Sequence, residues 1–154
     1  MKPAVKAIDV PPATRPAAPE PFASRLGAWE GRSLGDNFAL TQFGVNLETV
    51  QPGCESALRH WHTRSDEFIY VLEGELTLVT DDGEAILTPG MCIGFKAGIE
   101  DAHHLINRTQ NSSTFLVIGT RIDGDEVHYP DDDFQWLPGK NGGWYAARRD
   151  GTRL

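Results

Sequence analysis

The amino-acid sequence predicts an all-β protein, and two observations carry this prediction. Short runs rich in apolar, β-branched and aromatic residues recur between positions 37 and 122, and the turn signals Gln51-Pro52-Gly53, Asp81-Asp82-Gly83 and Pro89-Gly90 separate them. Strands of this length at this spacing are typical of a β-sandwich or β-barrel. A chain of 154 residues is most simply one domain with one hydrophobic core.

Two of the expected strands are apolar without alternation, from Phe68 to Leu72 and from Phe115 to Ile118. This pattern suits strands covered on both faces by an opposing sheet, a partner subunit or the arm described below, and it leads us to expect a homodimer. The expected strands cover residues 37–50, 57–62, 67–73, 75–80, 84–88, 91–95, 103–108 and 114–122.

The segments on either side of this β region, which spans 37–122, differ from it in composition. Residues 1–36 are expected to form an extended Pro/Ala-rich N-terminal arm and lead-in, because six prolines within 1–21 exclude regular helix or central strand. The lead-in, from 22 to 35, is expected to be irregular or helical. Residues 123–154 are polar and predict an irregular C-terminal tail that packs on the barrel through Trp136, Trp144 and Tyr145.

The acidic composition restricts the partners that this chain can have. A formal net charge of −8 and a pI near 5.0 argue against nucleic acid or an anionic membrane and favour a small-molecule ligand. No run approaches the length of a membrane span, and the N-terminus lacks the apolar stretch of a secretory signal, so we expect a cytoplasmic protein. Cys54 and Cys92 form no C-x-x-C motif; we favour buried free thiols, and a disulfide between them stays open.

Four of the five histidines fall in two tight pairs, His60 with His62 and His103 with His104. In a β-strand an H-x-H pair sends both imidazoles to one face and Trp61 to the other. A turn after His62 would let Glu67 face the same cavity. Imidazole with carboxylate is the usual mixed ligand set for transition metals, so the sequence predicts one divalent ion per chain: zinc, iron, manganese or nickel.

These residues resemble the first motif of the cupin superfamily, G-x5-H-x-H-x3-4-E-x6-G. His60 and His62, four residues, Glu67, six residues and Gly74 match it, whereas six residues rather than five separate Gly53 from His60. The second motif, G-x5-P-x-G-x2-H-x3-N, is matched more loosely. Its residues here are Gly90, Lys96 in place of proline, Gly98, His103 and Asn107, with two extra residues between Gly98 and His103.

The resemblance implies a double-stranded β-helix, or jelly-roll barrel, with a metal in its mouth held by His60, His62, Glu67 and a fourth ligand. His103 is favoured for the fourth position because it keeps the motif spacing to Asn107. His104 and then Asp101 remain the alternatives, since strict spacing from Gly98 would fall on Asp101. Within the family such a site leaves one or two positions open for water, oxygen or substrate, as catalytic metal sites do.

The family resemblance favours a metal-dependent enzyme that acts on a small polar metabolite, either isomerase-like or dioxygenase-like. The alternative is a small-ligand-binding or sensing barrel without chemistry, because fold does not fix function. No catalytic residue is assigned; Tyr70 is expected to be a core residue rather than a general acid. Four basic side chains flank the ligands and receive no assigned role: Arg59, Arg64, Lys96 and Arg108.

Overall fold

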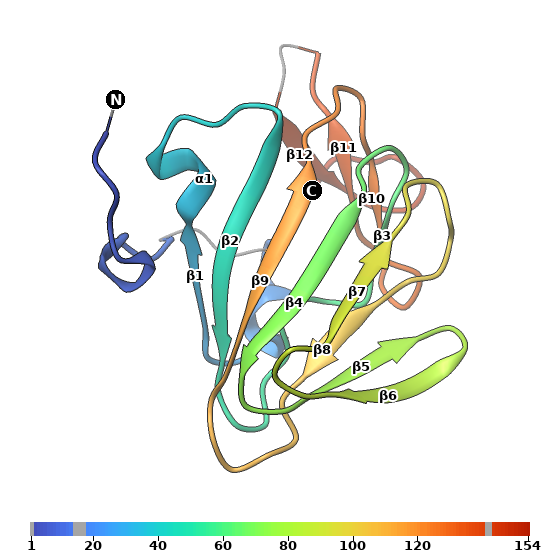
Figure 1. Cartoon of the computed structure of the whole chain (residues 1–154). Coiled ribbons are helices and arrows are strands. Elements are labelled where there is room, and N and C mark those ends of the chain that lie inside the picture. The colour runs from blue at the N-terminus through green and yellow to red at the C-terminus, as the bar shows by residue number, and fades with distance from the viewer. Residues whose placement is uncertain (1, 14–17, 141–142) are drawn as a thin grey trace.

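The computed structural model describes residues 2–13, 18–140 and 143–154 (Figure 1). Parts of the expected arm (residues 1 and 14–17) and of the expected tail (141–142) lie outside the described residues. Within the described ranges the chain folds into antiparallel strands, with one short α-helix, α1 (Leu34–Asn37), and two single 3-10 turns, Ala7–Asp9 and Ala23–Arg25. The all-β fold class is therefore confirmed.

The largest sheet has five strands in the order β1-β2-β9-β4-β7. Two neighbouring strands within it, β9 and β4, contain the two apolar runs expected from the sequence. Side chains along each strand alternate between the barrel interior and the outer face of the sheet. The strands are β1 (Trp29–Ser33), β2 (Phe43–Val50), β9 (Ser113–Thr120), β4 (Glu67–Glu73) and β7 (Cys92–Phe95).

A second sheet of three strands, in the order β6-β5-β8, encloses the main core together with the first sheet. Its strands are β6 (Gly83–Leu87), β5 (Leu76–Thr80) and β8 (His104–Ile106). Inward residues of both sheets form the core, which gives the jelly-roll barrel expected from the sequence. The core contains Val50, Ile69, Val71, Leu76, Leu78, Leu87, Leu105 and Phe115.

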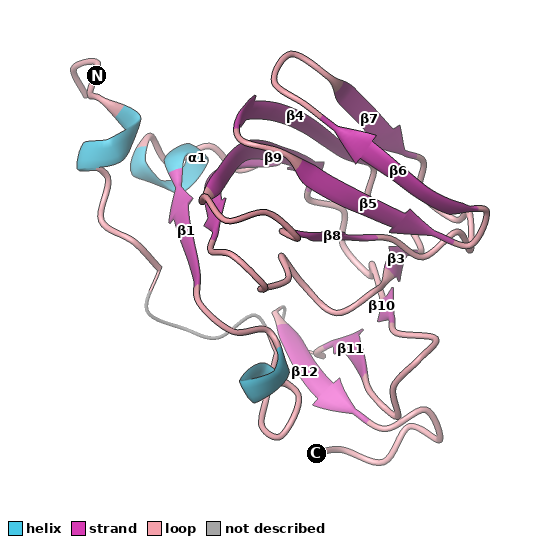
Figure 2. Cartoon of the chain, turned by 90° about the horizontal axis from the view of Figure 1, so that it is seen from below, coloured by secondary structure: helices cyan, strands magenta, loops and turns pink. Residues whose placement is uncertain are grey.

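Strands also form where an irregular C-terminal tail was expected, and that prediction is wrong in this respect. A third sheet has the order β12-β11-β10-β3, and in Figure 2 β11 and β12 lie below the main barrel strands. Its strand β10 pairs with the histidine strand β3, placing Val127 opposite His62 and His128 opposite Trp61. The bounds are β3 (Trp61–His62), β10 (Val127–His128), β11 (Gln135–Pro138) and β12 (Trp144–Ala147).

A second apolar cluster joins the N-terminal segment to these C-terminal strands. Phe22 stacks on Phe134 with ring centroids 5.1 Å apart, and Trp136 packs against the same cluster, as expected for a side chain that fixes the tail. Trp144, in contrast, is 48% exposed, and Tyr145 lies under the Arg153 guanidinium at 5.0 Å. The buried members of the cluster are Ala18, Leu26, Leu58, Val127, Tyr129 and Phe134.

The lead-in differs from the prediction in part. Residues 29–33 of the stretch expected to be irregular or helical form β1, whereas the 3-10 turn Ala23–Arg25 agrees with the prediction. The sequence of β1, WEGRS, has no apolar alternation, and the strand exists because it pairs along its whole length with β2. The strand expected over 57–62 is limited to Trp61–His62, and His60 forms an isolated bridge to His103. Cys54 and Cys92 are both free thiols, as expected, but neither is fully buried: Cys54 is half-buried and Cys92 is exposed.

The outer face of the five-stranded sheet is uncovered in the single chain. Phe68, Tyr70 and Leu72 are each about 40% exposed, so β4 is not buried on both faces by this chain alone, and Tyr70 is not a core residue. Among the described residues, no helix is long and apolar enough to cross a membrane.

Candidate metal centre

The two motif histidines are placed by backbone pairing, His60 with His103, just before β8, and His62 with β10. The His60 and His103 main chains exchange two hydrogen bonds, of 3.1 and 2.9 Å, and His62 pairs with Val127. Glu67 opens β4 and lies opposite Phe95 of β7. Segments from three parts of the sequence therefore meet at one end of the barrel.

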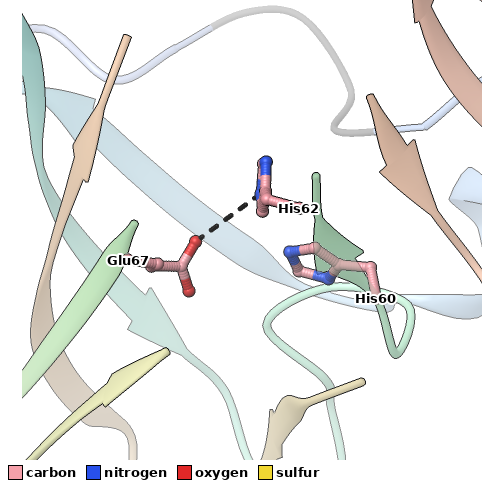
Figure 3. A group of neighbouring side chains, drawn as sticks. All are labelled: His60, His62 and Glu67. Atoms are coloured by element: carbon pink, nitrogen blue, oxygen red, sulfur yellow. Dashed lines mark ion pairs between the residues drawn. The ribbon is translucent and has the colours of Figure 1, made fainter. Parts of the chain in front are cut away.

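The structure brings His60, His62 and Glu67 together, as predicted (Figure 3). One ligand atom from each lies within 4.8 Å of the others, and the three side chains converge on a common point. The distance from His62 Nε2 to Glu67 Oε2 is 3.9 Å. Two ligands that each bind one ion at about 2.0–2.2 Å lie about 3–4 Å apart, so this pair already has the spacing of a metal site.

His60 is prepared to act as a neutral nitrogen ligand. Its Nδ1–H donates to the carbonyl of Leu58 at 2.7 Å, which leaves the lone pair on Nε2. Burial, together with the neighbouring His103, lowers the pKa of His60 to about 3. The imidazole is therefore uncharged near neutral pH, and the uncharged ring is the form that binds a metal.

His62 is oriented by a carboxylate that the sequence analysis missed. Its Nδ1–H donates to Asp125 Oδ2 at 2.8 Å, so its Nε2 also faces the cluster. Burial by itself would raise the pKa of Asp125, but hydrogen bonds from His62 and from the Arg64 backbone hold the pKa below its usual range. Such a carboxylate–histidine pair fixes the ring tautomer of a metal ligand. Asp125 lies in a polar segment 63 residues from His62, and nothing in the local sequence marks it.

We expect Asp125→Asn to lower metal affinity by about 10- to 100-fold while the fold is retained, because the His62 ring loses its anionic partner. Titration of the metal-free protein by calorimetry measures this effect. Asp123→Asn, two residues away and outside the cluster, is the matched control, and equal affinities for the two variants would contradict the role of Asp125.

Glu67 is an ionised carboxylate that contacts the fourth predicted ligand. His103 Nε2 lies 3.0 Å from Glu67 Oε1, and His103 is 2% exposed, with its ring stacked on Phe95. Burial by itself would raise the pKa of Glu67, but the hydrogen bond from His103 and the electrostatic effect of the three neighbouring histidines together outweigh it, and the pKa falls to about 2. His103 thus borders the three-residue cluster without being part of it.

The two alternative fourth ligands make contacts elsewhere. His104 points away from His103 along β8, and its Nδ1–H donates to the carbonyl of Ala57 at 3.1 Å. The Asp101 carboxylate accepts from the backbone amide of Asp81 at 2.9 Å. His103 is therefore the candidate that lies nearest to the cluster.

A cavity of about 200 Å³ inside the barrel opens beside His60, Glu67 and His103. It is smaller than typical ligand pockets, which measure about 300–1,000 Å³, so it has room only for a small molecule. Polar residues that the sequence analysis did not select also line it, among them Glu48 and Tyr129. The available signal for Glu48 was an acidic residue at an inward position of the strand that ends in the buried Val50.

Of the four flanking basic residues, two are held in ion pairs away from the cluster. Arg59 pairs with Asp81 and Asp131, and Arg108 with Glu84 at 2.6 Å. Arg64 donates to the carbonyl of Asp123 at 3.5 Å. Lys96 lines a water-sized recess of about 10 Å³ next to His62, Glu67 and His103.

The donor set fits a divalent transition metal. His60 presents an unprotonated Nε2, the Nε2 of His62 faces the same cluster, and Glu67 supplies a negative charge, so a 2+ ion would find two imidazole nitrogens and one anionic ligand. Three protein ligands leave coordination positions free, which is the pattern of catalytic rather than structural sites.

Comparisons with known proteins agree with this architecture. The family model for a cupin domain matches residues 46–119, and no curated protein matches the chain. The crystal structure of a sugar phosphate isomerase of the cupin superfamily from Silicibacter pomeroyi superposes with a TM-score of 0.91 at 37% identity, covering 99% of this chain and 96% of that one.

Two further solved structures are similar. A candidate sugar phosphate isomerase from Acidithiobacillus ferrooxidans has a TM-score of 0.72 at 32% identity, covering 82% of this chain and 80% of that one. The polyketide cyclase RemF from Streptomyces resistomycificus has a TM-score of 0.63 at 23% identity, covering 78% and 80%, and shares the fold. The whole-length similarity to the first structure and the histidine–glutamate cluster lead to one conclusion: this chain belongs to the cupin superfamily.

Proposed function

We propose that this protein is a metal-dependent isomerase of small sugar phosphates. The observation that carries the proposal is the cluster of His60, His62 and Glu67, with both free Nε2 atoms directed at one point, at the wall of a 200 Å³ cavity. Two relatives above 30% identity, named as a sugar phosphate isomerase and as a candidate one, supply the substrate class. A cytoplasmic location is part of the proposal.

The residues around the cluster suit a sugar phosphate whose hydroxyl groups lie in the cavity and whose phosphate lies near Lys96. A divalent ion in the cluster would polarise a carbonyl oxygen of the substrate. The cavity is lined by the polar groups of Asn46, Glu48 and Tyr129 and by no lysine or arginine, so it suits the hydroxyl-bearing end of the sugar. Lys96, at the recess beside the cluster, offers a cation for the phosphate, and no ion pair occupies it among the described residues.

The direct test is an isomerase assay with metal-loaded protein. Protein is purified without a histidine tag, its native metal is measured by elemental analysis, and each of the four candidate metals is restored in turn. Aldose and ketose phosphates are the substrates, and the unphosphorylated sugars are the matched controls. Turnover of the phosphates is expected. Oxygen consumption with stoichiometric iron, or tight sugar phosphate binding without turnover, would replace the proposal by a dioxygenase or by a binding module.

His103 is proposed as the fourth ligand. Its Nε2 lies 3.0 Å from Glu67, and two ligands at right angles on one ion have the same separation. We expect His103→Ala to lower metal affinity at least about tenfold and His104→Ala, one residue along, to leave it unchanged. Metal titration of both variants decides between them, and the reverse order would transfer the assignment to His104.

A homodimer is proposed from the uncovered outer face of the five-stranded sheet. Its cross-strand register aligns Val45, Ile118 and Phe68 in one row and Leu47, Leu116 and Tyr70 in the next. A continuous apolar face on a soluble chain marks an interaction surface, and a second copy is the simplest self-complementary occupant.

We expect the protein to sediment at twice its 16.9 kDa mass at micromolar concentration. Phe68→Glu places a charge in the proposed interface, so it should weaken association at least about tenfold, whereas Ile86→Glu on β6, also exposed, should not. A wild-type monomer in analytical ultracentrifugation at this concentration would overturn the dimer.

A further inference from the structure

The barrel interior holds a carboxylate that the metal cluster does not use. On β2 the side chains of Asn46, Glu48 and Val50 point inward; Val50 belongs to the main core, and Asn46 and Glu48 line the 200 Å³ cavity. The same cavity is lined by His60, Glu67 and His103. Glu48 thus shares the space in which a substrate would meet the cluster.

The sequence of β1 holds Glu48 in place. Trp29 Nε1–H donates to Glu48 Oε2 at 3.0 Å, and Glu48 lies opposite Gly31 in the β1–β2 register. A Cβ at residue 31 would lie 2.3 Å from the Trp29 ring, so the glycine leaves the room that the indole needs to reach Glu48. The W-x-G segment therefore forms a support for one carboxylate, and no basic side chain pairs with Glu48 among the described residues.

The other titratable groups around the cavity have different tasks or properties. Glu67 is an ionised member of the cluster, and His60 is neutral. Burial raises the pKa of Tyr129 above its usual value, and His104 is hydrogen-bonded to Ala57. His103 contacts Glu67.

Glu48 differs from these groups because it titrates near neutral pH. Burial raises the pKa of Glu48 to about 7, while the hydrogen bond from Trp29 opposes that rise and the nearby Glu67 adds to it. A general base is most effective when its pKa lies near the working pH.

We propose that Glu48 is the catalytic residue that transfers the proton between the two carbon atoms of the substrate. This inference rests on the proposed isomerase function. It assigns the role to Glu48 because its carboxylate lines the cavity beside the metal cluster, is fixed by Trp29 and has no competing ion pair.

The step balances without an oxidant or a further reactant. The Glu48 carboxylate removes the proton from the carbon that bears a hydroxyl group next to the carbonyl. The electron pair of the C–H bond forms the carbon–carbon double bond of an enediolate, and the C=O electron pair moves onto the former carbonyl oxygen. The neighbouring hydroxyl group passes its proton to that oxygen. The Glu48 carboxylic acid then returns its proton to the former carbonyl carbon, and the oxygen that lost its proton forms the new carbonyl.

The experiment compares metal-loaded wild type with Glu48→Gln and Trp29→Phe. Glutamine keeps the shape and can still accept from Trp29, so Glu48→Gln should retain its metal and its circular dichroism spectrum but lose about 100-fold or more in kcat. Wild type should show an acid limb in kcat/KM between pH 4.5 and about 7, because a bound cation favours the carboxylate form. Trp29→Phe should move this limb upward, because the carboxylate loses its donor.

Each outcome bears on one of the two proposals. Turnover by Glu48→Gln within threefold of wild type, or an acid limb that Trp29→Phe leaves in place, overturns the role of Glu48 and leaves the isomerase function standing. No turnover of any sugar phosphate by metal-loaded wild type overturns the isomerase function and the role of Glu48 with it. If Glu48→Gln fails to fold, the pH profile of Trp29→Phe still decides.

Discussion

Replacing His62 or His60 by alanine is expected to remove the bound metal and to reduce isomerase turnover by about 1000-fold or more. Each variant deletes one of the two nitrogen ligands, and a metal ion contributes several kcal/mol of transition-state stabilisation, where each 1.4 kcal/mol is about tenfold in rate. Elemental analysis should fall from near one ion per chain to a small fraction. The β-sheet spectrum should persist, because neither histidine belongs to an apolar core cluster.

His128→Ala is the matched control for these variants. Its ring stacks on Trp61 at 4.8 Å and its Nε2 contacts Glu126, so it is a histidine near the same strands but outside the cluster. It should keep its metal and its activity. Retention of stoichiometric metal in both His60→Ala and His62→Ala would refute the assignment of the site.

Gly74→Ala is expected to destabilise the fold by about 2–5 kcal/mol. Gly74 lies between β4 of the five-stranded sheet and β5 of the three-stranded sheet, and its φ of 76° is in the left-handed region, which costs alanine about 1–2 kcal/mol. An added Cβ would also lie 2.4 Å from Ser113 Oγ and 2.8 Å from the carbonyl oxygen of Ser112. The backbone oxygen cannot rotate away, so an overpacking cost of about 1–3 kcal/mol follows.

Gly53→Ala separates the conformational cost of the positive φ from the cost of crowding against Ser112 and Ser113. Gly53 has the same φ of 76°, but its added Cβ meets nothing within 4 Å, so only the conformational cost applies. Urea denaturation followed by circular dichroism should place Gly74→Ala about 1–3 kcal/mol below Gly53→Ala in unfolding free energy. Equal stabilities would mean that the crowding at Ser112 and Ser113 is relieved at little cost.

The sequence predicted the barrel strands well where they are apolar and bounded by turns. β4 begins and ends at the expected residues, Glu67 and Glu73, because the apolar run from Phe68 to Leu72 and the following glycine are local features of the sequence. The sequence did not predict β1 and β10, because these strands depend on pairing with distant segments. WEGRS and Val127-His128 carry no hydrophobic period and become strands only through pairing with β2 and β3.

The acidic run from Asp131 to Asp133 is a second case in which the local sequence does not reveal distant partners. It has no glycine-spaced calcium-loop pattern, so the sequence alone predicts a solvated acidic turn. In the structure the run does form a turn with Asp131 and Asp133 exposed, but Asp132 is buried. Each carboxylate also meets an arginine from elsewhere in the chain: Asp131 meets Arg59, Asp132 meets Arg25 and Asp133 meets Arg148. These partners lie up to 107 residues away, so local composition could not reveal them.

The sequence by itself determined the fold class, because short apolar runs bounded by turns are local features. It also determined the residues that could share a metal, because the two-residue period of a strand places both imidazole rings of an H-x-H pair on one face. Tertiary structure alone decided which further groups join them. Backbone pairing of His60 with His103 turns that histidine toward Glu67 and its neighbour His104 toward Ala57. Closure of the barrel likewise brings Asp125 to His62 and Glu48 to the cavity, since contacts between distant segments depend on sheet register, which no local pattern encodes.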